Sequence, residues 1–165
     1  MKFINVKTKN EIKELAALAS KIWHEYWPCI LTNEQINYMV EKYQSINAIS
    51  NQLKNENYIY HIVKIKKPIG YFGVSTKSNY LFLSKFYLIK EARNNGFGKV
   101  IFKEIIKIAK ENNKKSIKLT VNKNNKNTIE AYKKWGFTII DSVVTDIGNG
   151  FVMDDYIMEY KLQEN

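Results

Sequence analysis

The segment from Arg93 to Lys99 combines positive charge with glycines at positions where a bulky anion can be bound. Apolar, strand-like residues 80–89 precede it. An amphipathic helix pattern follows it, and its expected apolar face consists of Val100, Ile101, Ile105, Ile108 and Ala109. A loop that leaves a strand and enters a helix directs unpaired backbone N–H groups and the positive end of the helix dipole toward one point. Gly96 and Gly98 lack the Cβ atoms that would hold an anion away, and they allow backbone angles closed to other residues. The segment therefore predicts a phosphate-binding loop.

Three interpretations of this loop can be tested against its residues. A dinucleotide-binding fingerprint needs a third small residue where Ile101 stands, and an acidic residue ~20 positions further on is missing. A nucleoside-triphosphate loop needs the pattern Gly-x4-Gly-Lys-Ser/Thr, and the glycines of this loop are spaced differently. A glycine-rich turn that binds nothing is a common connector between a strand and a helix, and the loop alone does not exclude it.

A second motif follows at residues 127–137, which read Asn-Thr-Ile-Glu-Ala-Tyr-Lys-Lys-Trp-Gly-Phe. The spacing predicts a short helix with Ile129, Tyr132 and Trp135 on one side. Gly136 is placed to end this helix in a left-handed conformation, and an apolar strand follows.

Taken together, the two motifs resemble those of a known enzyme family. Arg-x-x-Gly-x-Gly between a strand and a helix resembles the pyrophosphate-binding motif of the GNAT acetyltransferases, which bind acetyl-coenzyme A. Residues 127–137 are similar to the Asn-x-x-Ala-x-x-x-Tyr-x-x-x-Gly-Phe block of the same family, with some compression. The motifs stand in the family's order, and the resemblance covers roughly residues 58–160. It implies acetyl-coenzyme A as the acetyl donor and no metal.

The resemblance also implies which residues contact the donor. In this family the pantetheine arm lies between two diverging strands and completes their backbone hydrogen bonding, and the glycine loop holds the pyrophosphate. Simple turn and cap chemistry explains Asn122 and Asn127 equally well. The expected cofactor-binding residues are Tyr87, Leu88, Ile89, Arg93, Asn94, Asn95, Gly96, Phe97, Gly98, Lys99, Asn122, Asn127 and Tyr132.

Tyr132 is the expected catalytic residue. Direct acyl transfer needs an acid for the thiolate that leaves as the acceptor nitrogen attacks, and a phenol with a pKa of ~10 can supply that proton. The resemblance implies this role for a tyrosine at this place. The alternative is a helix tyrosine that only packs with Ile129 and Trp135.

The general base is not found where the family usually has one. Many family members carry a glutamate on the strand before the loop, but residues 83–87 read Leu-Ser-Lys-Phe-Tyr and contain no carboxylate. Other candidates are His24, Glu25, Asp154 and Asp155, or a chain of water molecules. His24 can equally be a partly buried structural histidine, and the two aspartates can be charges at a strand edge.

The acceptor is predicted from residues 23–28, Trp-His-Glu-Tyr-Trp-Pro, which fall in the family's variable acceptor region. Aromatic rings with carboxylates can cage a cationic amine, which favours a small amine or polyamine, although Trp23 fits a core position equally well. Acetylation of a protein N-terminus or lysine is the alternative, and a non-catalytic module that binds acyl-coenzyme A is an alternative of another class. The expected acceptor-binding residues are Glu25, Tyr26, Trp27, Asp154 and Asp155.

The elements that must position these residues are predicted from periodicity and caps. Thr8 and Thr32 each begin a helix pattern, and short apolar runs separated by tight turns predict an antiparallel meander over residues 58–89. The strand at 114–121 returns parallel to 80–89 through a helix. The expected fold is α+β: a mixed, mainly antiparallel sheet of about seven strands flanked by helices, with a splayed parallel pair at the centre.

A single acetyltransferase domain is expected, with acceptor-side helices in residues 1–57, the acetyl-coenzyme A core in 58–137 and a C-terminal hairpin in 138–165. The length of 165 residues suits one domain. The one cysteine, Cys29, excludes an intramolecular disulfide. No run approaches ~20 apolar residues and no signal peptide is recognised, so a soluble, cytoplasmic protein without a membrane partner is expected.

The formal charge of +10 comes from lysines spread along the whole chain. Because no nucleic-acid recognition module is recognised, a dedicated nucleic-acid partner is not expected. A small-molecule amine remains the expected partner, and the protein is expected to be a monomer or a homodimer.

Overall fold

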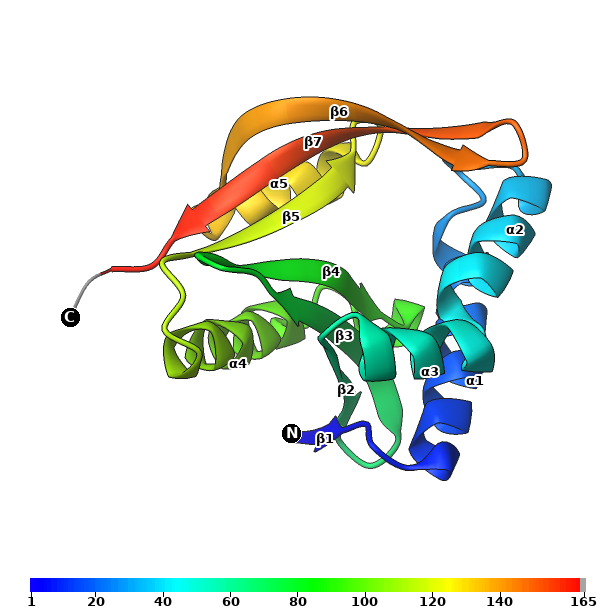
Figure 1. The fold of residues 1–165 in the computed structure, drawn as a ribbon, viewed down its shortest axis with the longest axis horizontal. Helices are drawn as coiled ribbons and strands as arrows, with labels where there is room; N and C mark the ends of the chain where they lie inside the picture. The colour runs from blue at the N-terminus through cyan, green and yellow to red at the C-terminus, as the bar shows by residue number, and fades with distance from the viewer. Residues whose placement is uncertain (164–165) are drawn as a thin grey trace. The chain divides into compact units, whose positions relative to one another are not determined.

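The structure is a computed structural model that describes residues 1–163, and its chain divides into two compact units (Figure 1). Unit 1 contains Met1–Ser75 and Ser84–Gly98. Unit 2 contains Thr76–Leu83 and the residues from Lys99 onward. Residues 164–165, which end the predicted C-terminal hairpin, lie outside the described part of the chain.

Unit 1 begins with a strand and three helices. The first helix is started by a capping box: the Glu11 amide donates to Thr8 Oγ1 at 3.2 Å, and the Thr8 amide donates to Glu11 Oε2 at 2.8 Å. Thr32 and Ser45 begin the next two helices as N-caps, with side-chain oxygens that accept from the Gln35 and Ala48 amides at 3.2 Å. The elements of unit 1 are β1 (Lys2–Asn5), α1 (Lys9–Tyr26), α2 (Asn33–Gln44), α3 (Ile46–Asn55), β2 (Tyr58–Lys64), β3 (Pro68–Thr76), the second half of β4 (Tyr80–Leu88) and the 3-10 helix η1 (Lys90–Ala92).

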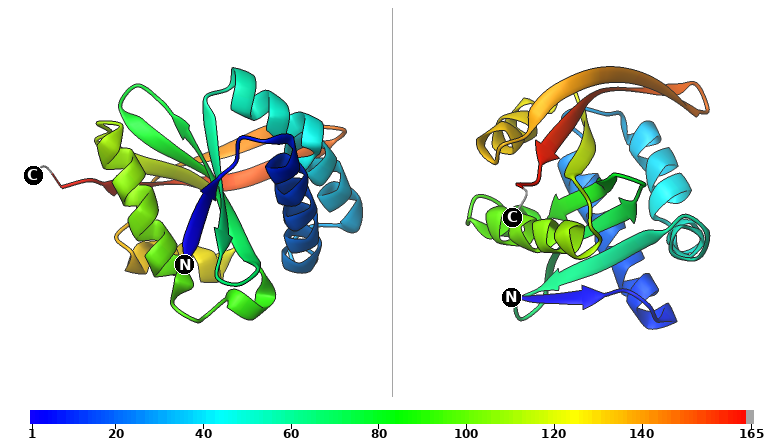
Figure 2. Two further views of the ribbon diagram at one scale, coloured as in Figure 1. Left: turned by 90° about the horizontal axis from the view of Figure 1, so that it is seen from below. Right: turned by 60° about the vertical axis from the view of Figure 1, so that its left-hand side comes forward.

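The core of unit 1 lies where α1 and α3 cover strands β2 and β3. Figure 2 shows α1, α2 and α3 side by side. Apolar side chains at helical spacing on α1 meet the alternate residues of the strands, as the amphipathic pattern requires. The buried cluster consists of Val6, Leu15, Leu18, Ala19, Ile22, Ile49, Tyr60, Ile62 and Tyr71.

Unit 2 is built on three strands and two helices. Its elements are the start of β4, then α4 (Phe97–Glu111), β5 (Ser116–Asn122), α5 (Lys126–Lys134), β6 (Thr138–Gly148) and β7 (Phe151–Lys161). Strand β7 lies antiparallel to both β5 and β6, and Figure 2 shows β6 and β7 side by side along their length. The Phe102 ring of α4 packs on Trp135, Phe137 and Tyr160, with centroid distances of 5.2–5.3 Å.

All seven strands belong to one mixed sheet in the order β1-β2-β3-β4-β5-β7-β6. Strands β4 and β5 are parallel, with Tyr80–Phe82 opposite Ser116–Lys118, and β2 is antiparallel to β3. The predicted α+β fold with a central parallel pair is therefore confirmed. Splaying of this pair beyond residue 82 stays a prediction.

One detail of the helix after the glycine loop was predicted wrongly. The sequence pattern places Val100 on the apolar face, but this residue is 47% exposed. Phe102 is buried instead, because it shares one helix face with Ile105 and Ala109 at spacings of three and seven.

Candidate active site

The glycine loop lies between η1 and α4, and its backbone departs from ordinary strand and helix angles. Asn94 has a φ of 61° and Gly96 a φ of 77°. A Cβ atom built on Gly96 would stand in open space, with nothing within 4 Å, so the backbone is uncovered at this position. Gly98 is the second residue of α4, and the first turn of this helix contains no acidic residue. The positive end of α4 is thus not neutralised by its own side chains.

Arg93 is the only arginine in the sequence, and its side chain turns back toward β4. Its Nε donates a hydrogen bond to the Leu88 carbonyl oxygen at 3.0 Å. The guanidinium carbon lies 4.8 Å from the centroid of the Tyr26 ring. In the described part of the chain, the buried Nη2 atom has no hydrogen-bond partner. One donor on a fixed guanidinium is therefore left for a ligand.

The side chain of Asn95 also holds the loop. Its amide nitrogen donates to the carbonyl oxygens of Glu91 and Arg93, both at 3.1 Å. Together with the Arg93 bond, these contacts fix the loop before any ligand is present, which lowers the entropic cost of binding an anion there.

The end of β4 already uses some of the main-chain groups that were expected to bind the pantetheine arm. The Ile89 amide donates to the Ile69 carbonyl oxygen at 2.9 Å, and the Leu88 carbonyl oxygen accepts from Arg93. On the neighbouring strand, Gly70 faces the carbonyl oxygen of Tyr87 so closely that a Cβ atom would collide with it. The path of β4 at Tyr87 and Leu88 therefore depends on this glycine.

An aromatic cluster surrounds Tyr87 within unit 1. Its ring centroid lies 5.5–6.4 Å from those of four other aromatic residues, Trp23, Tyr26, Trp27 and Tyr71. Trp23 is 3% exposed and donates from Nε1 to Tyr71 Oη at 2.9 Å, as expected for a core residue. Trp27 is also buried, and its Nε1 has no hydrogen-bond partner among the described residues.

His24 and Glu25 lie apart from this cluster, on the exposed side of α1. His24 Nε2 lies 2.7 Å from Asn37 Oδ1, and Nδ1 lies 2.7 Å from the Ser20 carbonyl oxygen. The bond to Asn37 is the main cause of a raised pKa of His24. Glu25 forms an ion pair with Lys21 at 3.9 Å. Both ring nitrogens of His24 are therefore engaged, but the side chain is exposed and not partly buried as the alternative had it.

In unit 2, the second motif forms α5 as predicted. Asn122 is buried, and its Oδ1 accepts a hydrogen bond from the Asn124 amide at 2.9 Å, which is turn chemistry. Asn127 is the second residue of α5 and is exposed. Gly136 has a φ of 101° after the helix end, so its predicted left-handed conformation is confirmed.

Tyr132 lies on the covered side of α5 and is 8% exposed. Its ring packs edge-on against Trp135 at a centroid distance of 5.7 Å and at a tilt of 56° against Phe137 at 5.3 Å. Its ring is therefore held in one position, which both a catalytic and a purely structural tyrosine require.

Asp154 and Asp155 are adjacent in sequence but differ in environment. Asp154 is exposed and pairs with Lys123 at 2.7 Å. Asp155 lies opposite Asn122 in the β5–β7 register and is 9% exposed, and its Oδ1 has no hydrogen-bond partner among the described residues. Burial, with a smaller contribution from Asp154, raises the pKa of Asp155 to about 6.

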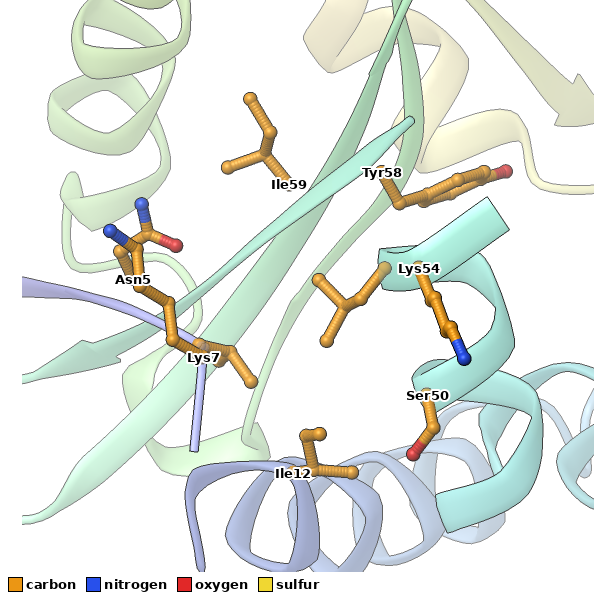
Figure 3. Close-up of a pocket in the computed structure, with 9 residues that line it drawn as sticks. Asn5, Lys7, Ile12, Ser50, Lys54, Tyr58 and Ile59 are labelled. Carbon is orange, nitrogen blue, oxygen red and sulfur yellow. The ribbon is translucent and has the colours of Figure 1, made fainter. Parts of the chain in front are cut away.

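A separate hollow in unit 1, with a volume of ≈ 470 Å³, contains none of the predicted site residues. Figure 3 shows it between the end of β1, helices α1 and α3, and strand β2. No cluster of metal-ligating side chains occurs among residues 1–163, and no helix in that range is long and apolar enough to cross a membrane.

Comparison with known proteins decides the family. The model of the acetyltransferase (GNAT) family matches residues 19–137, which is more than half of the chain. The chain belongs to the GNAT family. It is therefore an acyltransferase, and acetyl-coenzyme A is the acetyl donor of its family. No curated protein matches the sequence.

Solved structures of GNAT proteins share this fold. The PaiA N-acetyltransferase of Thermoplasma acidophilum, in complex with coenzyme A, is 23% identical with a TM-score of 0.79, covering 98% of this chain and 100% of its own. A GNAT acetyltransferase of Elizabethkingia anophelis with acetyl-coenzyme A bound is 18% identical, with a TM-score of 0.60 and coverage of 72% and 84%. The ribosomal-protein-alanine N-acetyltransferase of Brucella melitensis is 15% identical, with a TM-score of 0.68 and coverage of 98% and 100%.

Proposed function

We propose that this GNAT protein transfers the acetyl group of acetyl-coenzyme A directly to a primary amine, with a small amine or polyamine as the acceptor. The observation that carries the proposal is the glycine loop. Its backbone is open at Gly96, its first helical turn lacks carboxylates, and Arg93 and Asn95 fix it in advance. These are the properties of a site for a doubly charged pyrophosphate.

In this function the residues from Asn94 to Lys99 bind the pyrophosphate through backbone N–H groups and the Lys99 ammonium. Arg93 holds the loop against Leu88, and its unpaired Nη2 adds a donor. Main-chain groups of Tyr87 and Leu88 bind the pantetheine arm. Asn122 and Asn127 are kept as cofactor-binding residues in this proposal, with Asn122 acting through the turn it shapes.

Tyr132 protonates the sulfur as the C–S bond breaks. The carbonyl carbon of the thioester changes its bond from sulfur to the acceptor nitrogen, and the thiolate takes the phenolic proton. The phenol then regains a proton from solvent, and the acceptor nitrogen loses one proton as the amide forms. Its packing against Trp135 and Phe137 supports this role, because a general acid must be held in position.

Asp155 is the residue best suited to bind the ammonium form of an acceptor. It is a buried carboxylate with an oxygen that lacks a partner, and a cation would supply the missing contact. Tyr26 can present a ring face to the same kind of ligand, but it already contacts Arg93. Glu25 and Asp154 are exposed and paired with lysines, so a cationic acceptor has to displace Lys21 or Lys123 to reach them.

Replacement of Gly98 by Glu tests the proposal. A glutamate in the first turn of a helix is compatible with α4, so the unliganded protein should keep its melting temperature. The carboxylate would occupy the anion site, and the thermal stabilisation by coenzyme A should vanish. Gly98→Ala is the comparison that adds a Cβ atom without the charge, and it should reduce this stabilisation less than Gly98→Glu does. The acceptor is identified by measuring thiol release from acetyl-coenzyme A with a panel of amines and of peptides with free N-termini.

Two results would contradict this proposal. An unchanged coenzyme A shift in Gly98→Glu would place the ligand elsewhere. Tight coenzyme A binding without thiol release for any amine or peptide would favour the non-catalytic module.

A further inference from the structure

Lys85 is a partly buried lysine on β4 whose ammonium group is surrounded by hydroxyl and aromatic groups. Its Nζ donates to Ser84 Oγ at 2.7 Å, and the Tyr58 hydroxyl donates to the same oxygen at 2.9 Å. The Tyr43 ring of α2 lies 5.9 Å from Nζ. All of these residues belong to unit 1.

In the described chain Lys85 forms no ion pair within 4 Å. Glu56 favours the charged form of Lys85, but this effect is smaller than the opposing effect of burial. An ammonium group that is desolvated without a counter-ion favours its neutral form. The pKa of Lys85 is accordingly lowered from its ordinary value to about 8 by burial.

The hydroxyl group of Ser84 suits both protonation states of this lysine. It accepts a hydrogen bond from the ammonium form, as the geometry shows. After loss of the proton, rotation of the Ser84 hydrogen lets it donate to the amine lone pair, while Tyr58 still donates to Ser84. The amine can therefore gain and lose a proton without leaving a buried group unpaired.

The position of Lys85 on β4 is the second observation. The pyrophosphate loop follows the end of this strand, so a pantetheine arm bound along Leu88 and Tyr87 runs back toward earlier residues. Lys85 stands two residues before Tyr87, about 7 Å along an extended strand. Residues two apart also point to the same face of a strand. The thioester end of the arm is therefore the end directed toward Lys85.

We propose that Lys85 is the general base of the acetyl transfer, an inference that rests on the proposed function. Neutral Lys85 takes one proton from the acceptor ammonium, and the freed nitrogen lone pair attacks the thioester carbonyl carbon. The C–N bond forms as the C–S bond breaks, and the sulfur takes its proton from Tyr132. The acetylated nitrogen loses its second proton to solvent, and the Tyr132 phenolate regains one from solvent. Lys85 then releases its proton to solvent, so one proton is set free per acetyl group transferred.

Two measurements on the full-length protein test this proposal. The first titrates Lys85 without any acceptor: limiting isotopically labelled acetic anhydride is added at pH values from 6 to 11, and labelling of each lysine is measured by mass spectrometry. The exposed Lys67 is the internal reference. Lys85 should reach half of its limiting reactivity near pH 8.

The second measurement compares Lys85→Arg and Lys85→Met with the parent, using the amine found in the thiol-release panel. Arginine keeps the charge but cannot lose its proton near neutral pH. Both variants should lose about 10²–10⁴-fold in kcat/KM at pH 7.5. They should keep the thermal shift by coenzyme A, and the rise of kcat/KM near pH 8 should disappear from the profile. Lys67→Arg is the control.

The outcomes separate this proposal from the proposed function. Full activity of Lys85→Arg, or labelling of Lys85 that parallels Lys67, would overturn the role of base and leave acetyl transfer intact. If Lys85→Met loses activity and Lys85→Arg does not, Lys85 acts through its positive charge and not as a base. A parent protein that neither binds coenzyme A nor releases thiol would refute both.

Discussion

Arg93 reaches back over five residues to the Leu88 carbonyl oxygen and closes the chain between the end of β4 and the glycine loop. The same guanidinium stacks on Tyr26 of α1. One planar group therefore joins the strand, the loop and the first helix of unit 1. A chain that uses lysine at its 25 other basic positions has arginine at this one. The flat, fork-shaped guanidinium suits these contacts in a way that an ammonium does not.

The exchange Arg93→Lys should therefore behave as a disruptive substitution. The charge is kept, but Nε, the stacking surface and Nη2 are lost together. A hydrogen bond to a charged group contributes about 1.5–3 kcal/mol, so coenzyme A affinity should fall by about 10–100-fold. Isothermal titration calorimetry measures the change. Equal affinity in Arg93→Lys and in the exposed control Lys67→Arg would show that the charge alone matters.

Replacing Tyr132 by Phe removes the proposed acid and keeps the ring. Packing with Trp135 and Phe137 should remain, so the melting temperature and coenzyme A binding should change little. Turnover should fall by about 10²–10⁴-fold. Tyr160→Phe is the control, because Tyr160 contacts Phe137 in the same cluster but has no proposed chemical role. A parallel loss of activity and coenzyme A affinity would instead indicate a structural tyrosine.

Gly70→Ala should displace β4 where the pantetheine arm is proposed to bind. The added methyl group would meet the Tyr87 carbonyl oxygen and the Leu88 side chain at less than contact distance, so one strand must move. We expect a loss of about 1–3 kcal/mol in unfolding free energy together with weaker coenzyme A binding. Gly150→Ala is the comparison: its methyl group meets open space but its φ of 77° is strained. It should lower stability without altering coenzyme A binding.

Asp155→Asn should make the protein more stable at neutral pH. The pKa of this carboxyl is about 6 in the folded chain and 3.8 ordinarily, so the folded state binds more protons between these values. The contribution of Asp155 to the free energy of unfolding therefore falls as pH rises from about 4 to 6, and it stays low above pH 6. Thermal melts of the variant and parent should differ most above pH 6, by at most about 3 kcal/mol, and converge near pH 4.

Asp154→Asn provides the control for that series, because Asp154 is exposed and its ion pair is at the surface. The same two variants test acceptor binding. If Asp155 binds the acceptor ammonium, Asp155→Asn should raise KM for the amine and Asp154→Asn should not. A variant that is more stable but has unchanged KM would confine Asp155 to a structural role.

The sequence was sufficient wherever a short segment determines its own structure. The caps at Thr8 and Thr32, the left-handed Gly136 and the order of strands and helices all follow from local chemistry, and they are confirmed. Tertiary contacts decide the rest. Periodicity could not tell that Phe102, and not Val100, faces the core. It also could not separate Asp154 from Asp155, since which of two adjacent residues is buried depends on the register with β5.

Lys85 shows the same limit for the site. In the sequence, Lys85 lies on the strand where many family members carry a glutamate. Nothing nearby in the chain indicates that its pKa is lowered. The groups that surround it come from residues 42 and 27 positions earlier, Tyr43 and Tyr58, through α2 and β2. The single signal available beforehand was a charged residue inside an otherwise apolar strand pattern.

The Asn95 amide that holds the glycine loop together is followed directly by a glycine. Asparagine followed by glycine is prone to spontaneous deamidation, because the small neighbour leaves the backbone nitrogen free to attack the side-chain carbonyl. Conversion of Asn95 to aspartate would replace the donor to Glu91 and Arg93 by an acceptor and bring a negative charge into a loop suited to anions. Deamidation of Asn95 would therefore remove the hydrogen bonds that hold the loop and would also repel its anionic ligand.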